Sequence, residues 1–215
     1  MWKEVMMATD KVAEDMDEKV IEEAEKTQSI GPEAIAALME ALAGANRRRR
    51  QEASHAIALA AAEDVNPFIQ YSDELIDALY RPEAQTRWEV LSTLSELLLV
   101  RPDLVEDAYD GAEASLFDED SAIVRLAAFR FLVRFGSCSP ERSDKVWNVL
   151  DEAIQCYHGD PEYRDMLTSL SELARGDISD QTRGELIERV GFDADNGRGY
   201  IRIMSSEIVA MAKGE

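Results

Sequence analysis

The sequence predicts an all-α fold in which similar helical hairpins stack into an α-solenoid, an α-α superhelix, with helices capping both ends. The chain has 215 residues but only 11 Gly and 6 Pro, which is too few breakers for the many turns of a sandwich or barrel. Hydrophobic residues make up 46% and charged residues 31%, a composition typical of folded globular chains. From residue 32 onward a pattern recurs every 37 to 39 residues, and repeated hairpins bury their apolar faces by stacking.

Residues 1–30 are predicted to form an N-terminal amphipathic capping helix. Met6, Met16 and Val20 belong to one narrow apolar stripe with three- and four-residue steps. Such a stripe either covers the exposed core at the end of the array or contacts a partner, and the cap is the favoured interpretation.

Residues 31–176 are predicted to form four hairpins. Arginines 50, 87, 125 and 164 form a column with spacings of 37, 38 and 39 residues. Prolines at positions 67, 102 and 140 separate the hairpins, because proline does not continue a helix. The predicted helix pairs are 32–44 with 47–63, 67–80 with 83–100, 102–117 with 121–135, and 140–157 with 161–175.

Residues 177–215 are predicted to cap the other end with two helices. The first covers 181–190 and ends at Gly191, and the second covers 200–212. A short strand at 200–204 is an alternative for the second. The segment 193–197 has the appearance of a calcium loop but has Met204 where an acidic ligand is needed, so a turn is predicted instead.

The segments 121–128 (SAIVRLAA) and 85–90 (QTRWEV) resemble HEAT repeats, a family related to armadillo repeats. The resemblance covers residues 32–176 and implies that second helices line a concave surface. It also implies a ladder in which an Asp of each intra-repeat turn meets an Arg of a neighbouring repeat; Asp120 and Asp160 match that position, while Asn46 and Glu83 replace it elsewhere. The Trp, Gly and Tyr signature of tetratricopeptide repeats is absent.

The charge balance restricts the partners. With 23 basic and 44 acidic residues the net charge is −21, which disfavours nucleic acids and anionic membranes. Cys138 and Cys156 form no metal or disulfide pattern, so two free thiols in a reducing cytoplasm are expected. No signal peptide or membrane span is predicted, and the chain is expected to be cytoplasmic.

Catalytic motifs are not evident. The two histidines, His55 and His158, are far apart, and zinc-protease, phosphate-loop and nucleophile-elbow patterns do not occur. The sequence therefore predicts no enzyme, cofactor or metal. Phe131 and Trp147, with helical spacing, are predicted to lie in the core.

The predicted function is a non-catalytic interaction or scaffold module that binds a protein or peptide through its second helices. Arg47, Arg48 and Arg49 precede the column residue Arg50. They either pair with acids such as Glu40 or Glu83, remain solvated, or bind an acidic peptide or phosphate. The other candidate partner-binding residues are Glu52, His55, Trp88, Glu89, Ser92, Glu96, Arg130 and Arg134. The alternative is a HEAT-like DNA glycosylase acting on alkylated bases, which the net charge disfavours; a HEAT-like tetrapyrrole lyase would need a bilin pocket.

Overall fold

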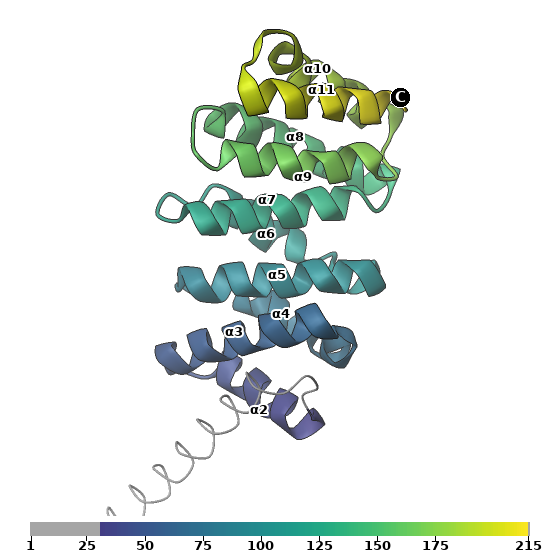
Figure 1. Cartoon of the computed structure of the whole chain (residues 1–215). Helices are drawn as coiled ribbons and strands as arrows, with labels where there is room; N and C mark the ends of the chain where they lie inside the picture. Colours follow the sequence, from purple (N-terminus) through teal and green to yellow (C-terminus); the bar gives the residue numbers. More distant parts are fainter. Residues whose placement is uncertain (1–30, 215) are drawn as a thin grey trace, which may run out of the picture. The chain divides into compact units, whose positions relative to one another are not determined.

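The computed structural model describes residues 31–214 and contains helices but no strand within that range (Figure 1). The predicted N-terminal capping helix lies outside the described residues. Contacts divide the chain into two compact units, the first ending at Val100 and the second beginning at Arg101. None of the helices between residues 31 and 214 combines the length and apolarity that crossing a bilayer requires.

The first unit contains two hairpins, and α3 packs against both α2 and α5. Its elements are α2 (Pro32–Ala43), α3 (Arg47–Glu63), the 3-10 helix η1 (Asn66–Tyr71), α4 (Ser72–Ala78) and α5 (Ala84–Val100). The predicted single helix over 67–80 is therefore two elements. Pro67 lies in the first turn of η1 and the Phe68 amide donates to Val65 O at 3.0 Å, an i to i−3 bond that fits the tighter helix.

The second unit contains three hairpins. Its elements are η2 (Pro102–Val105), α6 (Ala108–Leu116), α7 (Ala122–Gly136), α8 (Pro140–Tyr157), α9 (Tyr163–Arg175), α10 (Asp180–Asn196) and α11 (Gly199–Lys213). The second helices α7, α9 and α11 pack in succession, and Figure 1 shows them side by side in chain order. Phe131 and Trp147 are buried, which confirms their core assignment.

The C-terminal segment differs from the prediction. α10 passes through Gly191 and ends five residues later, because a glycine inside a helix costs only about 1 kcal/mol. The amide of Gly197 then donates to Asp193 O at 2.9 Å and closes the last turn, so residues 193–196 are helical rather than a turn. Residues 199–213 are helical, so the strand alternative is wrong, and α10 and α11 form a hairpin like the preceding ones.

The first three arginines of the column, Arg50, Arg87 and Arg125, occupy equivalent positions, because each is the fourth residue of its helix. Arg50 donates to Gly44 O at 2.9 Å in its own turn and pairs with Glu83 of the next hairpin. Arg125 repeats this arrangement with Asp118 O at 2.8 Å and Glu162. The acid in the second case is Glu162 rather than the expected Asp160, because Glu162 directly precedes the second helix, as Glu83 does.

Arg164 is not equivalent to the other column members. It is the second residue of α9, and the fourth is the buried Met166. The true period at this point is 41 residues, the distance between the first residues of α7 and α9. Arg164 is consequently exposed and lies over the ring of Tyr200, 5.9 Å from its centroid.

Candidate functional site

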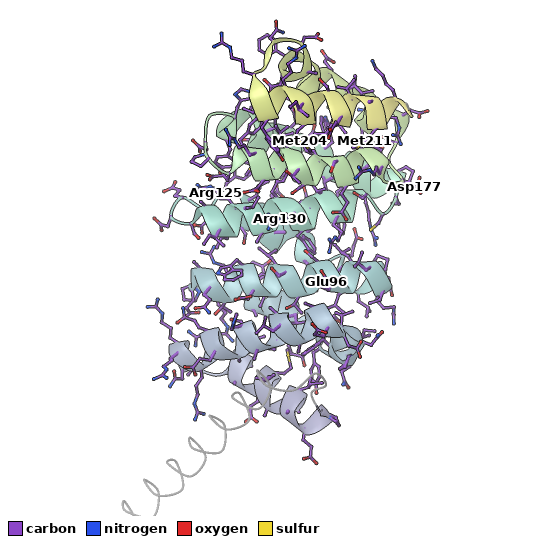
Figure 2. All side chains as sticks on the ribbon, viewed as in Figure 1. Glu96, Arg125, Arg130, Asp177, Met204 and Met211 are labelled. Atoms are coloured by element: carbon purple, nitrogen blue, oxygen red, sulfur yellow. The ribbon has the colours of Figure 1, made fainter. Side chains whose placement is uncertain are left out.

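Each second helix leaves the same stripe of side chains uncovered. The ninth residue of each is His55, Ser92, Arg130, Ser171 or Glu207, and the thirteenth is Leu59, Glu96, Arg134, Arg175 or Met211. None of these ten residues is buried, whereas Ile57, Leu94, Leu132 and Leu173, two positions after the ninth, are fully buried. We call these two rows the exposed columns; Figure 2 labels Glu96, Arg130 and Met211 among their members.

In the first unit, α3 and α5 contain nine of the predicted site residues. His55 Nδ1 lies 2.7 Å from Glu89 Oε1 and so connects α3 to α5. Glu89, expected to face outward, is only 3% exposed. Burial raises the pKa of its carboxyl, and the hydrogen bond from His55 opposes this. Around the pair, Ser92 is exposed, while Glu52, Trp88 and Glu96 are half-buried.

The four consecutive arginines are partly accommodated within the protein. Arg50 is buried, and its hydrogen bond lowers the pKa of the Glu83 carboxyl. Arg48 pairs with Glu52 one turn later at 2.6 Å. Arg49 lines a hollow of about 420 Å³ together with Glu40. Arg47 is exposed. The Asn46 side chain caps this helix by accepting from the Arg49 amide at 3.2 Å, which compensates for the absence of an acidic first turn.

In the second unit, Arg130 and Arg134 lie on the uncovered side of α7. Arg130 is exposed and has no ion pair among the described residues. Arg134 Nε donates to Glu172 Oε1 of α9 at 3.0 Å. On α9, Thr168 Oγ1 lies 2.6 Å from the hydroxyl of Tyr200 on α11. Hydrogen bonds therefore connect α7 to α9 and α9 to α11 along this side.

The sequence interpretation missed a polar cluster between α8, α9 and α10, in which Tyr163 and Asp193 are buried and His158 is exposed. Asp193 accepts from the Tyr163 hydroxyl at 2.8 Å and lies 3.0 Å from His158 Nε2. Burial and the bond to Asp193 raise the Tyr163 pKa. Arg189 is paired with Asp151 beside it, with Nη2 to Oδ2 at 2.8 Å. His158, Tyr163, Arg189 and Asp193 line a cavity of about 410 Å³, but each of these four side chains has a polar partner within the protein.

Sequence signals for the missed residues were weak. His158 and Asp193 are 35 residues apart, and Tyr200 follows Thr168 by 32. Asp193 lies opposite the turn that follows α8 because α10 continues to Asn196. The predicted helix, which ends at residue 190, does not include Asp193. The two cysteines, in contrast, are free thiols as expected.

Comparison with solved structures identifies the fold. A designed armadillo repeat protein in complex with the peptide (KR)4 has a TM-score of 0.71 and 15% identity, covering 89% of this chain and 91% of its own. An engineered protein from a structural genomics consortium gives 0.71 and 14%, covering 94% and 91%. A computationally designed armadillo repeat protein for modular peptide recognition gives 0.68 and 14%, covering 89% and 91%.

Neither a protein-family model nor a curated protein matches the chain. The structural likeness nevertheless extends over most of the chain. It agrees with the succession of helical hairpins, without a strand, that residues 31–214 form. The chain therefore has the armadillo/HEAT-like repeat fold.

Proposed function

We propose that this chain is a non-catalytic binding module whose second helices hold a segment of a partner protein. The observation that carries the proposal is the exposed columns: at two positions in every second helix, side chains remain accessible at regular intervals. Within either unit, a periodic surface of this kind suits an extended peptide, whose side chains also recur at regular intervals.

The chemistry of the exposed columns supports the same function. They contain charged, hydroxyl, imidazole and aliphatic side chains, and thus offer both hydrogen bonds and apolar contact. An interface core needs a few apolar or arginine anchors within a polar rim. The fold adds support, since designed armadillo proteins of similar structure recognise peptides.

The cavity between α8 and α10 supports a catalytic function less well. Its buried carboxylate, Asp193, already accepts bonds from Tyr163 and His158, and the neighbouring guanidinium is paired. A site whose polar groups bond to one another stabilises the fold more readily than it binds a substrate.

The test is a selection of 12-residue peptides on the full chain from a displayed random library, followed by affinity measurement with labelled peptides. We expect selected peptides to lose at least tenfold in affinity when Ser92 or Arg130, members of the exposed columns, is replaced by Trp. The matched control is Glu152→Trp, an exposed position of the first helix α8. Equal binding to the Ser92, Arg130 and Glu152 variants would refute a second-helix binding surface.

A further inference from the structure

In the second unit, the first and second helices differ in the sign of their charge. The first helices α6, α8 and α10 contain eleven acidic and four basic residues, while the second helices α7, α9 and α11 contain three acidic and seven basic residues. α7 is the extreme case, with three arginines and no acid. The exposed columns of these second helices contain Arg130, Arg134 and Arg175 against the single acid Glu207, so this side is basic within a chain whose net charge is −21.

Two of these arginines, Arg130 and Arg164, are available for a partner. Arg125 is occupied by Glu162 and Asp118 O. Arg130, by contrast, is exposed and has no ion pair among residues 31–214. Arg164 is also exposed and lies against an aromatic ring rather than an acid. A guanidinium that is held in place but lacks a carboxylate is suited to a bidentate contact with one.

Apolar side chains accompany the arginines on the same side. Ile123 on α7 is 60% exposed and Ile203 on α11 is 58% exposed. Ile123 precedes Arg130 by seven residues, two helical turns, so both face the same way. Tyr200 is held by Thr168 and stands three residues before Ile203. Exposed aliphatic, tyrosine and arginine side chains together are typical of interface anchors.

We propose that this surface, defined by Ile123, Arg130, Arg134, Arg164, Tyr200 and Ile203, binds an extended peptide segment rich in Asp and Glu with apolar residues between them. The inference rests on the proposed function and specifies the partner's chemistry. Three adjacent helices at an interaxial distance of about 10 Å span about 20 Å, so about six extended residues cross them.

A nucleic acid fits the same surface less well. Duplex binding at physiological salt draws on about six to ten phosphate contacts. The arginines on this side are Arg130, Arg134, Arg164 and Arg175, and Arg134 is already paired with Glu172. The acidic first helices of the same unit would in addition repel a long polyanion. A short acidic segment can bind through the arginines of the second helices alone, without coming close to the acidic first helices.

The experiment measures labelled 12-residue peptides by fluorescence anisotropy against the full chain in 0.15 M salt. One peptide alternates Glu with Leu and Tyr, a second replaces every Glu by Lys, and a third replaces every Glu by Gln. We expect the acidic peptide to bind at least tenfold more tightly than the other two. Arg130→Glu and Arg164→Glu should each weaken it at least tenfold, whereas Arg130→Lys should retain most of the affinity.

Lys145→Glu on the first helix α8 is the matched control, because it makes the same charge reversal away from the surface and should change the affinity less than twofold. Far-UV circular dichroism and thermal unfolding verify that each variant is folded. Tighter binding of the basic or neutral peptide, or equal effects of the Arg130 and Lys145 reversals, would overturn the acidic preference. Tighter binding of a 20-base-pair duplex, or a dimer in sedimentation that Arg130→Glu dissociates, would do so as well.

This inference and the proposed function can fail separately. If library-selected peptides depend on the second helices but are basic or neutral, binding by this face stands and the acidic preference is wrong. If no selected peptide depends on the second helices and the acidic peptide does not bind, both are wrong.

Discussion

Removal of Arg50 should destabilise the first unit far more than removal of Arg134 destabilises the second. Both arginines pair with a glutamate of a neighbouring hairpin, but they differ in burial. The Arg50 and Glu83 side chains are 9% and 3% exposed, and those of Arg134 and Glu172 are 26% and 44% exposed. Arg50→Met keeps most of the aliphatic stem and leaves Glu83 as a buried, unpaired carboxylate.

The magnitude follows from the cost of an uncompensated buried charge. Breaking a buried ion pair by removing one partner costs about 3 to 5 kcal/mol, and Arg50→Met also leaves Gly44 O without its donor. An exposed pair is worth at most about 1 kcal/mol. We therefore expect a loss of about 3 kcal/mol in the free energy of unfolding for Arg50→Met and less than about 1 kcal/mol for Arg134→Met. Glu83→Gln in the Arg50→Met background should recover part of the loss.

The assay is urea unfolding followed by far-UV circular dichroism, with hydrogen exchange of peptides from α3 and α5 to locate the effect. Acid provides a second measurement. Arg50 lowers the Glu83 pKa in the folded state, so this pair stabilises the wild-type protein above the ordinary Glu pKa and its contribution is lost as pH falls. The difference in the free energy of unfolding between the wild type and Arg50→Met should therefore become smaller toward pH 4. Equal losses for the two Met variants, or a gap that widens in acid, would refute the reasoning.

Four further variants test single contacts and helix positions. Because burial raises the Glu89 pKa, the charged form is unfavourable when folded, so Glu89→Gln should raise the melting temperature at pH 7.5 and lose this advantage as pH falls through the raised pKa. Tyr163→Phe removes the buried donor to Asp193 and leaves His158 as its remaining partner, and it should cost about 2 kcal/mol in urea unfolding. Gly136→Ala places a methyl group 2.5 Å from a side chain of α8 and should destabilise by about 1 to 3 kcal/mol, whereas Gly184→Ala meets nothing within 4 Å and should stabilise by up to about 1 kcal/mol in the same assay.

Helical periodicity made most of the repeat array predictable. Residues three and four apart share a helix face whatever the tertiary context, so the core positions Phe131 and Trp147 could be assigned from their spacing alone. The turn acid Glu83 could be related to Arg50 because both belong to a recurring pattern. The same periodicity predicted which side chains of the second helices face outward. Glu89 is the exception, because it is buried and contacts His55 of α3.

The predicted repeat register was wrong at the fourth hairpin, where the first helix is longer than in the hairpins before it. α8 is a continuous helix of 18 residues, whereas the two preceding first helices are short and follow a 3-10 segment. The extra length stretches the repeat to 41 residues, and Arg164 happens to stand where an unchanged period would place an arginine. Pairs such as His158 with Asp193 were equally inaccessible, because their proximity depends on how two hairpins stack rather than on spacing within either one.

The net charge of −21 is a weak guide to the partner, because binding depends on charges within a short distance. At 0.15 M salt the Debye length is about 8 Å, comparable with the distance between neighbouring helices. An acidic segment in contact with Arg130 on α7 is screened from most acids of the first helices, which lie on the other side of their hairpins. The net charge slows the approach of such a segment at low salt, but the arginines that touch it determine whether it remains bound. An acidic chain can therefore present a locally basic surface, and the proposed acidic partner rests on the division of charge between first and second helices rather than on the total.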